Sequence, residues 1–287
     1  MLDGWASRDE SIHLRFGQEY HSALELYDKL MAVQDTDSEE AIRLVVRSIL
    51  QRTIGWNPDR DSRAGKYKNR DSLISLVVDY LDHFHPDPAQ TYIKSNGEPA
   101  VELSFRFELD FAPRNYEVVE PGGMGQPYLL AGHLDRVVEF NGQLLVMDRK
   151  TTTATLSAYY FSQYEPHNQR TLYTLAGRHI LAAPIRGVII DAAQILLEKP
   201  NAFARGFTYR TDDQLGEWIE DLQTQLTINE AYAEADHWPM NDTACDRFGG
   251  CKFRGICSKS PSVRERFLAN DFDKLEESER WNPLRSR

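Results

Sequence analysis

The chain of 287 residues carries 44 acidic and 33 basic side chains, for a formal net charge of −11, and 41% of its residues are apolar. The apolar content is that of an ordinary globular protein and excludes a chain that is disordered throughout. The negative charge excludes a protein that coats nucleic acid with its whole surface, although a local basic groove is compatible with it. No apolar run reaches the roughly 18 residues that cross a bilayer, and residues 1–11 lack the pattern of a secretory signal. We therefore expect a cytoplasmic protein with no membrane partner.

The first third of the chain is predicted to be helical. Apolar residues recur at helical spacing within residues 16–31. Thr36 followed by Glu39 resembles a capping box, which would begin a second helix. A third helix is predicted over residues 71–84, and the segment 56–70 before it is predicted as a loop.

The middle of the chain is predicted to contain strands. Residues 101–109 alternate as in a strand, and the glycines and prolines of 121–127 predict a loop. Strands predicted over 128–140 and 143–150 are joined by Asn141-Gly142, a pair typical of two-residue hairpins. Further predictions are a helical stretch over 156–180 that is broken near Pro166, a strand over 187–197, a helix over 212–235 and a fraying end beyond Phe267. This order predicts an α/β domain built around one sheet.

The hairpin predicts a site. A two-residue loop pairs Phe140 with Gln143 and therefore places Asp135 opposite Asp148, with Cβ atoms roughly 4.5–5.5 Å apart. Two carboxylates so close repel each other unless a cation lies between them. Lys150, two residues after Asp148, shares that face of the sheet.

Two carboxylates and an ammonium at one place suit phosphodiester hydrolysis with Mg²⁺ or Mn²⁺, since these ions prefer oxygen ligands and lower the pKa of a bound water. The backbone carbonyl of Arg149 could be a further ligand. The alternative is a solvent-facing hairpin with an ordinary Asp–Lys pair. Val137 and Val146 flank the carboxylates on the same face, which favours partial burial and a bound cation.

Three motifs in order resemble a known family. Gly132-His-Leu-Asp135, Asp148-Arg-Lys150-Thr-Thr and Gln169-Arg-Thr-Leu-Tyr173 are similar to the PD-(D/E)XK nuclease superfamily, within it to the RecB-like branch of phage and bacterial exonucleases and the CRISPR adaptation nuclease. The resemblance covers about residues 14–260. It implies a restriction-endonuclease-like α/β core, a mixed central β-sheet flanked by helices, with a helical N-terminal part and a Cys-bearing C-terminal segment.

The resemblance also implies boundaries within one compact unit. Residues 1–95 would form the helical region that carries a metal-binding histidine, residues 96–240 the nuclease core, and residues 241–287 the Cys-containing segment and polar tail.

The family pattern implies roles for further residues. An early helix with a glycine and then a metal-ligating histidine matches Gly17 and His21, which lie four residues apart on one helix face. His133, which the hairpin register would place opposite Lys150, is a second candidate for the histidine ligand. Gln169 and Tyr173 would organise the site and contact substrate. Glu102 is a weaker candidate for another carboxylate.

All three cysteines lie near the C-terminus, at Cys245, Cys251 and Cys257. Their clustering points to metal binding rather than disulfides. The resemblance implies a [4Fe-4S] cluster, but no cysteine precedes His21, so the fourth ligand is missing. His237, Asp246 or a longer N-terminus could complete the site, and inert or zinc-binding thiols are the alternative.

The resulting expectation is a divalent-metal-dependent DNA exonuclease of phage or bacterial recombination or repair. Two basic clusters could contact DNA, or could be solvated surface. They comprise Arg60, Arg63, Lys66, Lys68 and Arg70, and Lys252, Arg254, Lys259, Arg264 and Arg266. The alternatives are an inactive nuclease-fold module that binds DNA or a partner, and a structure-dependent endonuclease. Candidate partners are a second copy of the chain, in a homo-oligomer, or a recombination protein.

Overall fold

A computed structural model of the protein describes residues 4–8, 11–32, 36–109, 128–246 and 250–276. The loop predicted over 121–127 lies outside these ranges. The chain forms two compact units, one of residues 12–108 and 129–222 and the other of residues 1–11, 109–128 and 223–287. None of the helices in the described ranges is long and apolar enough to cross a membrane.

The larger unit contains helices and one mixed sheet. Its helices are α1 (Ile12–Ala32), α2 (Ser38–Arg52), α3 (Arg63–Tyr67), α4 (Arg70–His83), α5 (Ala158–Ser162), α6 (Asn168–Leu181) and the first part of α7 (Asp212–Glu234). Its strands are β2 (Gln90–Thr91), β3 (Val101–Glu108), β4 (Leu129–Phe140), β5 (Gln143–Thr152), β6 (Gly187–Gln194) and β7 (Ala202–Tyr209). Strands β5 and β6 are parallel, and every other pair among these strands is antiparallel. Both β2 and β3 pair with β4, on successive stretches of that strand.

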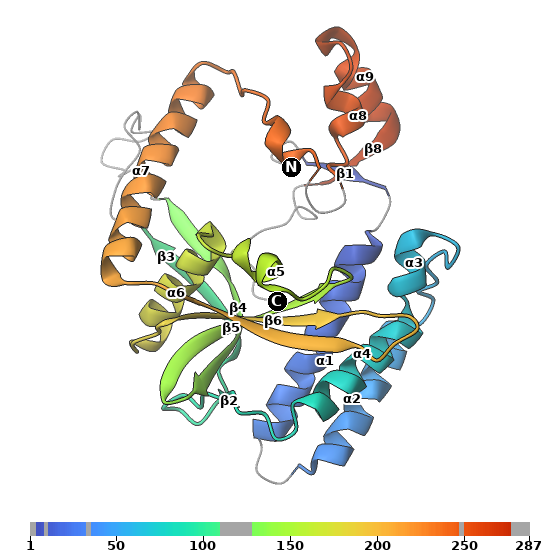
Figure 1. The fold of residues 1–287 in the computed structure, drawn as a ribbon. Coiled ribbons are helices and arrows are strands. Elements are labelled where there is room, and N and C mark those ends of the chain that lie inside the picture. Colours follow the sequence, from blue (N-terminus) through green and yellow to red (C-terminus); the bar gives the residue numbers. More distant parts are fainter. Residues whose placement is uncertain (1–3, 9–10, 33–35, 110–127, 247–249, 277–287) are drawn as a thin grey trace. The chain divides into compact units, whose positions relative to one another are not determined.

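Helices cover both faces of this sheet (Figure 1). On one face, α6 packs on β4, β5 and β6 through a core that includes Val137, Val146 and Ala176. On the other, α1 and α4 form a core with α2, and Ala193 and Ile195 of the β6 segment join it. The mixed sheet flanked by helices and the helical N-terminal part are therefore confirmed. The two faces of β5 therefore meet different helices: Asp148 pairs with Arg170 of α6, and Arg149 pairs with Asp28 of α1.

The smaller unit brings the two ends of the described chain together. Strand β1 (Trp5–Ser7) pairs antiparallel with β8 (Phe272–Lys274), which follows α8 (Arg254–Cys257) and α9 (Pro261–Asp271). A short 3₁₀ helix covers Asp242–Ala244. The rings of Phe253 and Phe272 stack with centroids 4.6 Å apart. The prediction that the chain frays beyond Phe267 is wrong as far as Lys274, because pairing with a strand from the other end of the sequence orders this segment.

Most predicted elements are confirmed, and several details differ. The N-cap of α2 is Asp37, whose side chain accepts no capping bond, so the capping box at Thr36 is wrong. The predicted loop 56–70 contains α3, whose N-cap Ser62 accepts a bond from the backbone N–H of Gly65. The strand β7 was not predicted; its alternation is broken by Gly206, and pairing with β6 sustains it.

Candidate active site

The tight turn between β4 and β5 has the geometry that its sequence demands. Asn141 and Gly142 both adopt positive φ, 49° and 71°, the conformation that a type I′ hairpin requires. Phe140 pairs with Gln143, as predicted. This local chemistry therefore sets the register of the two strands that carry the motifs.

The β4–β5 ladder opens into a fork next to two acidic residues. Its last pair is Arg136 with Met147, and Asp135 and Asp148 come directly after it, one on each strand. Beyond this point β4 continues to pair with β3, while β5 continues to pair with β6. The separation frees space and backbone groups between the two strands, and the candidate site lies there.

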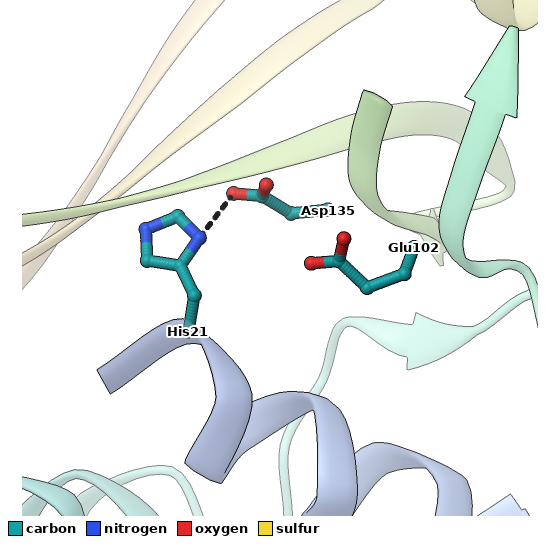
Figure 2. Close-up of side chains that lie close together, drawn as sticks. All are labelled: His21, Glu102 and Asp135. Atoms are coloured by element: carbon teal, nitrogen blue, oxygen red, sulfur yellow. Dashed lines mark ion pairs between the residues drawn. The ribbon is translucent and has the colours of Figure 1, made fainter. Parts of the chain in front are cut away.

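Three side chains from different elements converge at the fork (Figure 2). His21 on α1, Glu102 on β3 and Asp135 on β4 each offer a ligand atom, and these atoms lie within 4.8 Å of one another. The Nδ1 atom of His21 lies 3.2 Å from Oδ2 of Asp135. In the described part of the chain, this is the one cluster of three His, Cys, Asp or Glu side chains close enough to hold a metal ion.

Glu102 occupies a strained position. Its φ is +50°, unusual for a residue with a side chain, and the β3–β4 pairing skips it between Val101↔Arg136 and Leu103↔Leu134. An interruption of this kind in a strand can redirect a side chain, and such strain often marks a functional site. Here it coincides with a carboxylate that joins the cluster.

Asp135 is held as an anion. Burial acts to raise the pKa of its carboxyl, but the charges of His21 and Lys150 and a bond from the backbone N–H of Arg149, 3.0 Å from Oδ2, outweigh it and leave the pKa far below its usual range. Burial likewise acts to lower the pKa of His21, and the neighbouring Asp135 carboxylate reverses the effect and raises the pKa above its ordinary value. The pair therefore favours a charged carboxylate beside a histidine that readily takes a proton.

Asp148 is buried beside this cluster and held by two cations. The Nζ atom of Lys150 lies 2.9 Å from its Oδ1 and 2.8 Å from its Oδ2, and Nη2 of Arg170 on α6 lies 3.0 Å from Oδ2. Asp148 and Arg170 are each only 1% exposed. The guanidinium of Arg170 also lies over the rings of Tyr164 and Tyr173. Asp148 and Lys150 both act electrostatically on His21, so all these charges share one site.

Gln169 and Tyr173 lie on one face of α6, as predicted. The amide Nε2 of Gln169 donates to the Tyr173 hydroxyl over 2.9 Å, and Nη1 of Arg170 donates to Oε1 of Gln169 over 3.1 Å. Burial, followed by the negative charges of Asp148 and Asp135, raises the pKa of Tyr173, so its phenol keeps its proton. The helix begins at His167, whose Nδ1 accepts from the backbone N–H of Gln169. These bonds order the start of α6, and the ion pair between Arg170 and Asp148 links this helix to β5.

The cluster suits a hard divalent cation. One imidazole nitrogen and two carboxylates are ligands that Mn²⁺ accepts, and carboxylates with water suit Mg²⁺. Ligands 2.0–2.1 Å from an ion lie at most about 4.2 Å apart, close to the spread of these three groups. Asp148 is outside the cluster of three, and its oxygens are shared by Lys150 and Arg170.

The chain matches the family model described as "PD-(D/E)XK nuclease superfamily" over residues 2–258. The chain belongs to this superfamily. Its mixed sheet with flanking helices is the restriction-endonuclease-like fold of that superfamily. Among solved structures, a crystal structure of a candidate exonuclease from Eubacterium rectale is similar, with 11% sequence identity, a TM-score of 0.48, and coverage of 91% of this chain and 81% of that one. At this identity the similarity assigns no residue a role. No curated protein matches the chain.

Two predictions about metal ligands can be compared with the geometry of the fork. The prediction that the hairpin register sets His133 opposite Lys150 is wrong, because the β4–β5 ladder ends before these residues. His133 instead pairs with Ser104 on β3, whose hydroxyl lies 2.9 Å from its Nδ1. The backbone carbonyl of Arg149 remains a predicted ligand; its amide is the group that the fork directs to Asp135.

Sequence reasoning ranked one site residue too low and missed another. Glu102 was a weak candidate because the connection from β3 to β4 is too long to fix a register from the turn. Arg170 was not singled out, since an arginine next to the Gln-x-x-x-Tyr motif gives no pattern of its own. The structure places both at the fork.

Among the described residues, the three cysteines are not arranged as a metal site. Cys245, Cys251 and Cys257 are free thiols, and within the described ranges their sulfurs do not form a cluster with ligand atoms within 4.8 Å of one another. Asp246, one candidate for a fourth ligand, forms an ion pair with Arg254. The arrangement does not fit an iron–sulfur cluster, and we derive no chemistry from one.

Proposed function

We propose that this protein is a Mg²⁺- or Mn²⁺-dependent DNA nuclease, and more narrowly an exonuclease of the RecB-like branch that acts in the cytoplasm on DNA ends in recombination or repair. One observation supports the metal dependence above all: His21, Glu102 and Asp135 converge at the fork beside the Asp148–Lys150 pair. The narrower assignment is supported by the order of the Asp, Asp-x-Lys and Gln-x-x-x-Tyr motifs along the chain.

Each residue of the fork would then have a role. His21, Glu102 and Asp135 would hold the metal, with Asp148 and the Arg149 carbonyl as further ligands. A bound divalent ion supplies Lewis-acid stabilisation of the phosphate and lowers the pKa of a coordinated water. The ammonium of Lys150 would orient the attacking water and stabilise negative charge on the phosphate.

The residues of α6 would support the substrate. Because Tyr173 keeps its proton, its hydroxyl can donate to a phosphate oxygen. Gln169 already holds that hydroxyl and would orient it. Arg170 would hold the buried carboxylate of Asp148 in place when Lys150 turns toward the substrate.

The experiment compares end-labelled linear DNA with closed circular DNA, each with Mg²⁺, Mn²⁺ or EDTA. We expect metal-dependent loss of linear DNA and survival of the circle. Asp135→Asn, Asp148→Asn and Lys150→Ala should each lower the rate by at least about 100-fold, as expected for groups that act on the transition state. Lys94→Gln, which removes a cation that pairs with Glu98 in the hairpin of residues 93–99, is the matched control.

Three outcomes would contradict parts of the proposal. Discrete fragments from the circle would replace the exonuclease by an endonuclease. DNA binding in EDTA without cleavage in either metal would indicate an inactive nuclease-fold module, alone or with a partner protein. Full activity of Lys150→Ala with a folded protein would remove the assignment of the site.

A further inference from the structure

Lys68 is a buried cation without a counter-ion. The residue is only 7% exposed, and among the described residues its ammonium has no hydrogen bond and no ion pair. The ammonium lies over the face of the Phe16 ring, with Nζ 5.6 Å from the ring centroid. Burial lowers the pKa of the Lys68 ammonium. A desolvated charge is unfavourable unless something compensates it, and a cation–π contact compensates only in part.

Other cations in the interior of the larger unit are paired with carboxylates. Arg149, Arg170, Arg205 and Arg136 each lie within ion-pair distance of at least one aspartate. Within the predicted basic loop, Arg60 pairs with Asp71, and Arg70 donates to the side chain and carbonyl of Thr53. Lys68 differs from Arg60 and Arg70 in having no partner among the described residues, and from the exposed Arg63 and Lys66 in being buried.

The backbone around Lys68 is held firmly. Ser62 caps α3 at its start, and Asn69 caps α4 directly after Lys68. The side chain of Asn69 also donates back to the carbonyl of Gly65, and the backbone N–H of Lys68 donates to the carbonyl of Ala64. The backbone of Lys68 therefore lies in an ordered segment between two helix caps, Ser62 and Asn69, which we call the double cap.

This double cap lies beside the N-terminal end of α1 (Figure 1). On α1, His13, Gly17 and His21 follow one another at intervals of four residues and share one side of the helix. A Cβ atom at Gly17 would meet nothing within 4 Å, so the missing side chain leaves open space one turn before His21. The side of α1 that carries His21 is therefore open at Gly17.

The distance along this side of α1, from His13 to His21, suits a nucleic acid strand. Lys68 acts electrostatically on His13, and His13 lies eight residues before His21, which is about 12 Å along a helix. Phosphates of one strand rise by about 3.4 Å per nucleotide along a duplex axis. A strand whose scissile phosphate lies at the fork would therefore bring a phosphate a few nucleotides away to the level of Lys68.

We propose that Lys68 binds a backbone phosphate of the nucleic acid substrate, on a path that crosses α1 over Gly17 and leads to the His21–Glu102–Asp135 cluster. This inference rests on the proposed nuclease function. It explains why a buried ammonium has no protein partner: the phosphate is its counter-ion. It also places positive charge near the site of a protein whose overall charge is −11.

The test measures binding, so it does not depend on cleavage. A fluorescein-labelled single strand of about 16 nucleotides is titrated with the full chain in EDTA at several NaCl concentrations, and anisotropy gives the affinity. Lys68→Met keeps the apolar stem and removes the charge. It should weaken binding at low salt. The salt slope, which is the slope of the logarithm of the binding constant against the logarithm of the NaCl concentration, should fall in magnitude by about 0.7, the value for one lost phosphate contact on a single strand. Lys68→Arg should retain the slope of the wild type.

Two controls separate a phosphate contact from a structural role. Lys94→Gln removes one positive charge, which pairs with Glu98 in the hairpin of residues 93–99, and should leave the slope unchanged. Because the buried ammonium is unpaired, Lys68→Met should unfold at a temperature no lower than the wild type. A slope for Lys68→Met equal to that of Lys94→Gln, or a lowered unfolding temperature with unchanged binding, would overturn the inference.

The inference and the proposed function fail in different ways. A wild-type protein that cleaves no DNA in either metal refutes the nuclease, while the salt slope still decides whether Lys68 contacts phosphate. Normal cleavage together with an unchanged slope in Lys68→Met refutes the contact and leaves the nuclease standing.

Discussion

The buried ion pair between Arg149 and Asp28 ties β5 to α1 on the sheet face opposite the candidate site. Nη2 of Arg149 lies 2.7 Å from Oδ2 of Asp28, and the two residues are 2% and 4% exposed. We predict that Arg149→Met strongly destabilises the protein, because methionine fills part of the space but leaves the aspartate charge without its closest partner. Removing one member of a buried pair costs roughly 3–5 kcal/mol.

The expected cost lies near the lower end of that range. Arg136 remains 3.6 Å from the other oxygen of Asp28 and partly compensates its charge. We therefore expect a loss of about 3 kcal/mol in the free energy of unfolding, measured by urea denaturation in EDTA. For a unit of this size that loss corresponds to a fall of about 6–12 °C in Tm.

Two comparisons make the prediction sharp. Arg43→Met breaks an exposed pair with Glu39 and should cost less than about 1 kcal/mol. Adding Asp28→Asn to Arg149→Met removes the stranded charge and should recover part of the loss. If Arg149→Met is no less stable than Arg43→Met, the reasoning about the buried pair is wrong. Since α1 also carries His21, the destabilised variant should require more Mg²⁺ for half-maximal activity.

Three further predictions concern the site and the sheet. Glu102→Gln should raise the Mg²⁺ concentration for half-maximal activity by on the order of 10-fold or more, and an unchanged metal requirement would exclude Glu102 as a ligand. Because the folded-state pKa of His21 is raised, the metal-free protein should lose stability as pH rises from about 6.5 through that pKa. Metal affinity should increase over the same pH window. In urea and metal titrations, His21→Gln should abolish both trends. Gly187→Ala would place a Cβ atom 2.0 Å from the carbonyl oxygen of Thr208 and should cost about 1–3 kcal/mol or more, whereas Gly216→Ala, in an open part of α7, should be neutral or stabilising in the same thermal assay.

Local chemistry explains which parts of the site could be predicted from sequence. Asn141-Gly142 fixes the hairpin because few residue pairs adopt positive φ easily, and the pairing of Phe140 with Gln143 follows from it. The prediction that Asp135 and Asp148 pair directly is wrong, because the ladder ends one pair earlier, at Arg136 and Met147. The spacing of Gln169 and Tyr173 places them on one face of a helix wherever that helix lies. His21 was singled out by the family resemblance and not by any local pattern.

Other features depend on contacts between distant segments. Glu102 reaches the fork because β3 pairs with β4 across residues 109–128, and no turn rule applies to so long a connection. Arg170 reaches Asp148 because α6 packs on β5. The burial of Lys68 without a partner follows from the packing of α3 against α1.

The sequence by itself determined the longer helices of the larger unit, the main hairpin, the order of the motifs and the superfamily they resemble, because helical periodicity, turn conformation and residue spacing are properties of short stretches of chain. Only the tertiary structure decided where the β4–β5 ladder opens, which carboxylates lie close together, and which buried charges lack a counter-ion. These depend on strand pairing and helix packing between residues that are far apart in sequence, and no local preference encodes them.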